Sequence, residues 1–212
     1  MRIAPASGMI ATGLVAVLRA PSADAYLPVM RTLVEAGVVS VEVTLTTPGT
    51  LEVLEHLRSQ LPETAEIGVG TVRTAHDAAA AIAAGARFLA TPTFKPAVIE
   101  TAVRAGIPVY SGAMTPTEVE AAWDSGSSAV KLFPAATVGP GFLSSLREPL
   151  PDVAVLPSGG IALPALADWF AAGAIAVSVG SPLIGSVFAD LDTDALTRRA
   201  GAFLAALKRV SR

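Results

Sequence analysis

The stretch Ser128-Ala129-Val130-Lys131-Leu132-Phe133-Pro134 carries one lysine among apolar residues and ends at a proline. An apolar run of this length before a turn signal predicts a buried strand. Burial disfavours the cationic form of lysine, and the neutral amine is a nucleophile toward carbonyl groups. The alternative is a structural lysine that extends to water or pairs with an acid. The other two lysines have different settings, since Lys95 precedes Pro96 at a predicted helix start and Lys208 lies in a charged C-terminal stretch.

Eight apolar runs of this kind occur along the chain, and each is followed by a segment of helical character. Most of these helical segments end at a glycine, which is a common helix stop. The predicted strands are 14–18, 40–45, 67–72, 87–90, 107–110, 129–133, 153–156 and 175–179. The helices that follow them are predicted over 23–35, 48–61, 76–84, 96–105, 116–124, 141–146, 164–172 and 193–210.

The alternation of strands and helices predicts an α/β protein with parallel strands buried on both faces. Eight units favour a single (β/α)8 TIM barrel, because the alternative, an open doubly wound sheet, commonly has about five or six strands. No linker or charge run divides the 212 residues. We therefore expect one domain over 1–212, in which the short N-terminal segment 1–12 closes the barrel.

The composition argues against several classes of partner. Hydrophobic residues make up 52% of the chain and charged residues 16%, which predicts a large core and apolar surface left over for subunit contacts. The net charge of −3 and the absence of a basic stripe argue against a nucleic-acid partner. Without cysteine there is no disulfide and no cysteine-ligated metal, which fits a cytoplasmic protein.

Two apolar segments resemble membrane or export signals. Residues 9–18 run into Arg19 without a cleavage site, so we interpret them as leading into a core strand. Residues 169–189 carry no charge, but Gly173, Gly180, Pro182 and Gly185 interrupt them. We interpret this segment as a helix end, a strand and a loop, and expect no membrane partner.

In such a barrel, chemistry takes place at the carboxyl ends of the strands and in the loops that follow. The polar and glycine residues at these ends, in chain order, are Arg19, Glu42, Thr44, Thr46, Thr71, Thr91, Thr93, Ser111, Gly112, Lys131, Ser158, Gly159, Gly160, Gly180 and Ser181.

Glu42 is the only acid inside a predicted strand. It alternates with Val41 and Val43, so its face of the strand points into the barrel. A buried carboxylate needs a partner, and Lys131 across the barrel mouth suits that role. Such a pair provides an amine nucleophile with an acid/base partner. A buried structural ion pair is the alternative.

Glycine turns follow strands seven and eight, at Ser158-Gly159-Gly160 and Gly180-Ser181. Barrels often bind phosphate at this place through backbone N–H groups, and glycine lets the backbone come close to the phosphate oxygens. We expect Ser158, Gly159, Gly160, Gly180 and Ser181 to bind phosphate. Ordinary turn chemistry is the alternative.

The sequence does not predict a metal site. His56 falls within a helix and His76 near a helix start, and no His, Asp and Glu residues have metal-ligand spacing. A metal-dependent aldolase or isomerase is therefore disfavoured.

Seven short pieces, in order from about residue 13 to 190, resemble the 2-keto-3-deoxy-6-phosphogluconate (KDPG) aldolases. That family includes the 4-hydroxy-2-oxoglutarate (KHG) and 2-keto-3-deoxy-6-phosphogalactonate aldolases. Each piece is weak alone, but together they are specific. They are 16–19 (AVLR), 41–45 (VEVTL), 68–72 (GVGTV), 112–118 (GAMTPTE), 130–134 (VKLFP), 157–161 (PSGGI) and 179–181 (VGS).

The resemblance implies a class I aldolase on a (β/α)8 barrel that is usually a homotrimer and needs no metal or other cofactor. Lys131 matches the Schiff-base lysine, Glu42 the general acid/base and Thr71 a threonine close to the pyruvyl group. The substrate that the resemblance favours is 2-keto-3-deoxy-6-phosphogluconate, which is split into pyruvate and glyceraldehyde 3-phosphate. The residues expected to contact the substrate are Arg19, Thr44, Thr46, Thr71, Pro92 and Phe133.

The chain departs from the family pattern at two positions that bear on the substrate. Thr46 stands where some members have an arginine, whereas Arg19 matches members that carry the arginine on strand one. Ser158 stands where threonine is common, and Gly139-Pro140-Gly141 resembles the galactonate-type members. The galactonate and 4-hydroxy-2-oxoglutarate aldolases therefore stay open as alternatives.

Two other classes of function also remain open from the sequence. One is a phosphate-binding isomerase or epimerase in which Lys131 forms no imine. The other is a barrel that binds a metabolite or a protein without catalysis.

Overall fold

A computed structural model describes residues 2–210 of the chain. Eight parallel strands form one sheet in the order β7-β6-β5-β4-β3-β2-β1-β8. A parallel bridge between Ser158 and Ser178 links the two end strands, so the sheet is a nearly closed barrel. The predicted (β/α)8 fold is confirmed. The strands are β1 (Leu14–Leu18), β2 (Ser40–Thr44), β3 (Glu66–Gly70), β4 (Leu89–Ala90), β5 (Val109–Ala113), β6 (Ala129–Leu132), β7 (Val155–Pro157) and β8 (Val177–Val179).

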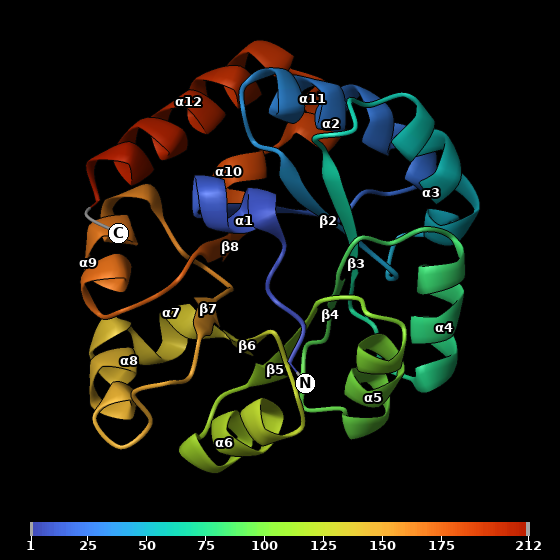
Figure 1. Cartoon of the computed structure of the whole chain (residues 1–212). Helices are drawn as coiled ribbons and strands as arrows, with labels where there is room; N and C mark the ends of the chain where they lie inside the picture. The colour runs from blue at the N-terminus through green and yellow to red at the C-terminus, as the bar shows by residue number, and fades with distance from the viewer. Residues whose placement is uncertain (1, 211–212) are drawn as a thin grey trace.

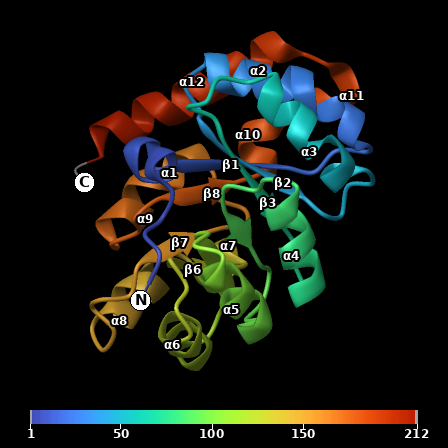
Figure 2. The same cartoon turned by 45° about the vertical axis from the view of Figure 1, so that its right-hand side comes forward.

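Helices surround the ring of strands on the outside (Figures 1 and 2). Two short 3₁₀ turns, Ala23–Ala25 and Leu163–Ala165, precede α2 and α9. The helices are α1 (Ser7–Thr12), α2 (Tyr26–Glu35), α3 (Thr50–Ser59), α4 (Ala75–Ala83), α5 (Pro96–Arg104), α6 (Pro116–Asp124), α7 (Ala135–Val138), α8 (Pro140–Arg147), α9 (Leu166–Ala171), α10 (Ser181–Ile184), α11 (Val187–Asp190) and α12 (Thr193–Arg209).

Two parts of the chain next to the site differ from the sequence-based expectation. The fifth strand is Val109–Ala113 and not 107–110, because Pro108 has no N–H to donate and the Ile107 N–H closes the end of α5 on the Ala102 carbonyl. Ser111 and Gly112 are therefore inside the strand. The predicted helix 141–146 lies within α8, whereas the four-residue helix α7 before Gly139 was not predicted.

Side chains alternate between two apolar layers. Those that point outward from the strands pack against the helices and form the larger cluster, as Val41, Val43, Val130 and Leu132 do. Those that point inward fill the barrel, where Val15, Phe88, Tyr110 and Leu156 form a second cluster with Met9 of α1. Strands buried on both faces explain why the eight runs read as nearly continuous apolar sequence.

The N-terminal arm lies across the end of the barrel where the strands begin (Figure 1). The Ala6 N–H donates to the Tyr110 hydroxyl at 3.0 Å, and the Gly8 and Met9 N–H groups donate to the Glu66 carboxylate at 2.7 and 3.1 Å. Met9 is fully buried. The predicted closing segment 1–12 includes Met1, which lies outside the described residues.

Candidate active site

The strands β2 and β6 place Glu42 and Lys131 on opposite sides of the barrel interior. Val41 and Val43 point outward, so strand alternation turns Glu42 inward, and Val130 and Leu132 do the same for Lys131. Four strand steps separate β2 from β6 in the eight-stranded ring. The sequence separation of 89 residues is thus closed by the barrel itself.

The two side chains form a buried ion pair. Lys131 Nζ lies 3.0 Å from both Glu42 Oε1 and Glu42 Oε2, and the side chains are only 8% and 3% exposed. A contact of this length is within the hydrogen-bond reach that general acid/base catalysis requires. Loss of either partner would leave a buried charge unpaired, which costs about 3–5 kcal/mol in measured cases.

Gly70 makes room for this pair, and the sequence did not single it out as part of the site. A Cβ at Gly70 would lie 1.9 Å from Glu42 Oε1, so any larger residue displaces the carboxylate. A Cβ at Gly112 would lie 2.2 Å from the Pro92 carbonyl carbon. Gly112 thus lets the backbone at Pro92 come close to β5. For Gly70, the available signal was the run Gly68-Val69-Gly70, which places glycine at two successive inward positions of β3.

A cavity of about 350 Å³ opens above the ion pair. All residues predicted for catalysis, substrate contact or phosphate binding line it except Thr44 and Thr46. The strand-end residues Thr91, Thr93, Ser111 and Gly112 do not line it, whereas Val17 and Pro182, which were not predicted, do. The lining residues are Val17, Arg19, Glu42, Thr71, Pro92, Lys131, Phe133, Ser158, Gly159, Gly160, Gly180, Ser181 and Pro182.

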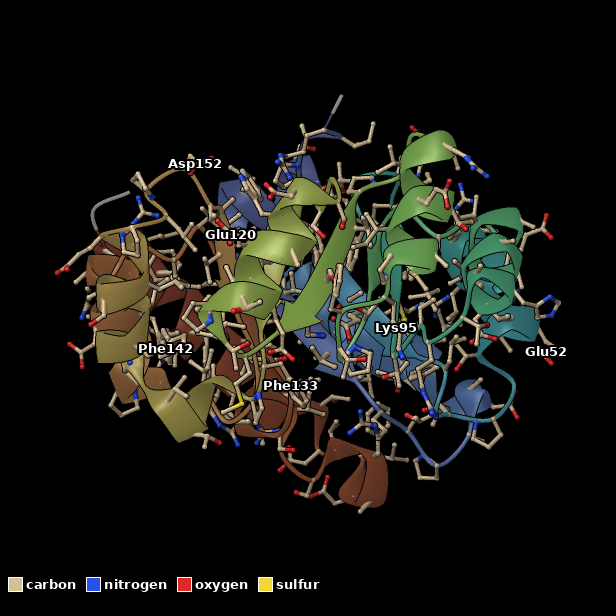
Figure 3. All side chains as sticks on the ribbon, turned by 90° about the horizontal axis from the view of Figure 1, so that it is seen from below. Glu52, Lys95, Glu120, Phe133, Phe142 and Asp152 are labelled. Carbon is tan, nitrogen blue, oxygen red and sulfur yellow. The ribbon has the colours of Figure 1, made fainter. Side chains whose placement is uncertain are left out.

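The cavity lies at the carboxyl ends of the strands. In the side view of Figure 3, Phe133, which follows β6, lies toward the edge opposite Asp152, which precedes β7. Phe133 is 38% exposed and forms part of the rim. Lys95 and Lys208 do not line the cavity, so among the lysines of residues 2–210 only Lys131 faces it.

Thr71 has an unusual backbone conformation directly after β3. Its φ is +59°, a left-handed value that β-branched residues rarely adopt. Strained residues of this kind tend to lie at functional sites, where the surrounding structure holds them in place. Here the turn brings Thr71 to the cavity wall beside Glu42.

Arg19 extends from the end of β1 to the cavity. Its Nε donates to Thr46 Oγ1 at 3.0 Å, and Thr46 Oγ1 lies 3.0 Å from Thr44 Oγ1. This contact uses the inner N–H of the guanidinium and leaves its outer fork for an anion. The two threonines thus act on the cavity through Arg19, because neither lines it directly.

The two glycine turns meet at one end of the cavity. Gly159 and Gly160 have φ of +91° and +75°, and their N–H groups have no hydrogen-bond partner within residues 2–210. The Ala135 N–H donates to the Ser158 carbonyl at 2.7 Å and the Ala136 N–H to the Gly159 carbonyl at 3.0 Å, which fixes the turn against α7. Free N–H groups at a turn of this kind suit an anion.

The geometry of the site agrees with the comparison to known families. A profile described as KDPG and KHG aldolase matches residues 7–198. The chain belongs to the KDPG and KHG aldolase family. It is therefore an aldolase, which is a lyase.

The similarity to individual family members extends over most of the chain. A 2-dehydro-3-deoxy-phosphogluconate aldolase of Treponema pallidum is 35% identical over 159 residues, which cover 74% of this chain and 75% of that protein. A 2-dehydro-3-deoxy-6-phosphogalactonate aldolase of Escherichia coli is 33% identical over 171 residues, which cover 80% and 83%.

A solved structure gives the same fold at lower identity. The KDPG aldolase of Legionella pneumophila, with pyruvate captured at low pH as a covalent carbinolamine intermediate, matches with a TM-score of 0.83 at 26% identity. The match covers 93% of this chain and 96% of that one.

Two other features bear on the class of protein. Within residues 2–210, no group of three or more His, Cys, Asp or Glu side chains is placed to hold a metal ion. None of the helices in that range is both long enough and apolar enough to cross a membrane.

Proposed function

We propose that this family member is a class I aldolase that cleaves a 2-keto-3-deoxy-6-phospho sugar acid into pyruvate and glyceraldehyde 3-phosphate. The observation that carries the proposal is the buried contact of Lys131 Nζ with both Glu42 oxygens at 3.0 Å, at the base of the cavity. The carbinolamine in the Legionella pneumophila structure supports covalent capture of pyruvate by this fold.

Imine formation begins with proton transfer from the Lys131 ammonium group to Glu42. The neutral amine then attacks the C2 carbonyl carbon of the substrate, and a proton moves from the attacking nitrogen to the former carbonyl oxygen to give a neutral carbinolamine. Loss of that hydroxyl as water leaves an iminium ion between Nζ and C2. Glu42 returns the proton for this loss, since it is the acid/base group within reach of Nζ.

Carbon–carbon cleavage follows from the iminium ion. Glu42, directly or through one water, removes the proton from the C4 hydroxyl group, and the C3–C4 bond electrons move into the iminium as an enamine. Glyceraldehyde 3-phosphate leaves with the new aldehyde at C4. Protonation of the enamine at C3 and hydrolysis of the imine release pyruvate and restore Lys131.

The remaining groups around the cavity suit the two charged ends of the substrate. Arg19 binds the C1 carboxylate with its free guanidinium fork, and Thr71 and Pro92 contact the pyruvyl part. Ser158, Gly159, Gly160, Gly180 and Ser181 bind the 6-phosphate, supported by the unpartnered N–H groups of Gly159 and Gly160.

The gluconate isomer is the substrate we favour, and the galactonate isomer is the second candidate. Relatives with both names are about equally similar to the chain. The segment Gly139-Pro140-Gly141 resembles the galactonate-type members and supports the second candidate. Both isomers give the same products, so a rate comparison on the two C4 epimers decides between them. The third candidate substrate is 4-hydroxy-2-oxoglutarate, which has no phosphate group.

We also propose that the chain forms a homotrimer, as the family resemblance implies. The expected cytoplasmic location and the absence of a cofactor stay predictions.

Borohydride trapping tests the proposed mechanism. Incubation with pyruvate and borohydride should reduce the imine and add one pyruvyl group per chain, and peptide mapping should place it on Lys131. Lys131→Ala should lose both the adduct and cleavage, whereas Lys95→Ala should keep both. An adduct on another lysine, or full activity of Lys131→Ala, would overturn the proposal.

A further inference from the structure

The short helix α10 carries Ser181 at one end and depends on another helix at its other end. Only four residues long, it makes the bonds Ile184 N–H to Gly180 O at 3.0 Å and Gly185 N–H to Ser181 O at 2.8 Å. A single helical turn is not stable by itself, because fixing its backbone costs more than one or two hydrogen bonds return. The position of Ser181 must therefore come from tertiary contacts.

Arg199 of α12 supplies such a contact. Its Nε donates to the Leu183 carbonyl and its Nη2 to the Ile184 carbonyl, each at 2.8 Å. These are the carbonyl groups that a helix end leaves without a partner. The Leu183 side chain is fully buried and that of Ile184 is nearly so, so little water reaches this end of the helix.

The local backbone is shaped around the guanidinium group. Gly185 ends α10 with φ of +61°, and a Cβ there would lie 2.7 Å from Arg199 Cζ. A positive charge at the carboxyl end of a helix is also favourable. Arg198, which directly precedes Arg199 in α12, is exposed and makes no side-chain hydrogen bond within residues 2–210.

We infer that Arg199 is a positioning residue for the phosphate end of the cavity, acting through α10 on the Ser181 hydroxyl. The inference rests on the proposed phosphate site. Arg199 lies on α12 and does not line the cavity, so its role differs from that of the glycine turns proposed to bind phosphate directly. Lys131 and Glu42 lie on β6 and β2, which Arg199 does not contact through α10. Loss of Arg199 should therefore weaken recognition of phosphate and leave the chemistry at C2 unchanged.

The test compares Arg199→Met with the matched control Arg198→Met. We expect Arg199→Met to raise KM for 2-keto-3-deoxy-6-phosphogluconate, and Kd for inorganic phosphate by calorimetry, about tenfold, as for one weakened charge-assisted hydrogen bond. kcat and KM for unphosphorylated 4-hydroxy-2-oxoglutarate, and trapping of pyruvate on Lys131, should stay unchanged. Arg198→Met should match the wild type throughout.

Two milder variants keep the inference testable if Arg199→Met folds poorly. Arg199→Lys retains one donor and should give an intermediate rise in KM for the phosphorylated substrate. Gly185→Ala keeps the arginine but displaces its guanidinium group, and should act in the same direction. An equal effect on both substrates, or none on phosphate binding by any folded variant, would refute the inference.

Ser181→Ala and Gly160→Ala, measured in parallel, separate this result from the phosphate assignment. If both weaken phosphate binding and Arg199→Met does not, only the role of Arg199 is wrong. If neither changes phosphate binding, the phosphate site is wrong and the inference fails with it.

Discussion

The two ends of the barrel each hold a carboxylate close to the interior, and the two are bound by different kinds of donor. At the amino ends of the strands, Glu66 accepts hydrogen bonds from the Gly8 and Met9 N–H groups and the Ser7 hydroxyl. At the carboxyl ends, Lys131 Nζ is the one hydrogen-bond donor to the Glu42 carboxylate within residues 2–210. Backbone donors are fixed, whereas an ammonium group at the end of a long side chain can move and lose its proton.

This contrast separates a structural carboxylate from a reactive one. Around Glu66 the interior is filled by Met9, Phe88 and Tyr110. Burial raises the pKa of the Tyr110 hydroxyl, so that group stays neutral at the closed end. Around Glu42 the interior opens into the cavity of about 350 Å³. The same barrel thus uses one end for stability and the other for chemistry.

The largest effect should come from Glu42→Gln. An amide of the same shape cannot take a proton from the C4 hydroxyl group, so kcat should fall by about 10²–10⁴-fold. Some pyruvate adduct on Lys131 should still form, since imine formation and cleavage are separate steps. Steady-state kinetics with borohydride trapping measures both. Unchanged kcat would show that Glu42 is structural, like Glu66.

Gly70→Ala sharpens the comparison without removing either charge. The added methyl group would lie 1.9 Å from Glu42 Oε1 and must move the carboxylate. A displacement of about 1 Å at a reacting group can cost about 10²-fold in rate, and we expect a loss of that size in kcat. Gly201→Ala, at an open helical position, is the control. Equal kinetics of the two variants would contradict the steric argument.

Glu66→Gln should act on stability and not on rate. The amide NH₂ cannot accept from both sides as the carboxylate does, so the free energy of unfolding should fall by about 1–3 kcal/mol. Urea denaturation measures the loss, with exposed Glu63→Gln as the control. A fall in kcat without a fall in stability would mean that the two ends of the barrel are not independent.

Glu118, like Glu66, accepts hydrogen bonds from fixed backbone donors, but its side chain is exposed to solvent. The Met114 and Thr115 N–H groups and the Thr115 hydroxyl donate to it, and they lower its pKa in that order of importance. Glu118→Ala removes half of the capping box of α6 and should cost about 0.5–1 kcal/mol or less at neutral pH.

The pH dependence of that loss gives a second check on Glu118. A lowered pKa in the folded state means that the stabilisation is present above the ordinary value of 4.5 and disappears as pH falls through the lowered pKa. The difference in unfolding free energy between wild type and Glu118→Ala should therefore shrink below about pH 4. A difference that is constant from pH 3 to 7 would exclude this carboxylate as its source.

The sequence by itself determined the repeating pattern, and with it most of the fold. Apolar runs of strand length that alternate with helices closed by glycine specify parallel strands, because only buried strands need apolar residues on both faces. The same reasoning found Lys131 and Glu42, since a charged side chain in a buried strand is costly unless it has a partner. Local pattern missed the four-residue helix α7, whose first N–H groups donate to the Ser158 and Gly159 carbonyls of a distant turn.

Only the tertiary structure decided which of these residues meet and how. Closure of the ring brings Glu42 to Lys131 across 89 residues, and no local signal encodes that distance. It also assigned Thr44 and Thr46 to Arg19 and not to the cavity wall, and joined Arg199 to α10. The sequence did not assign Gly70 to the site, because its role is to leave space for the side chain of another strand. Such roles depend on what lies opposite in space, which sequence neighbours do not specify.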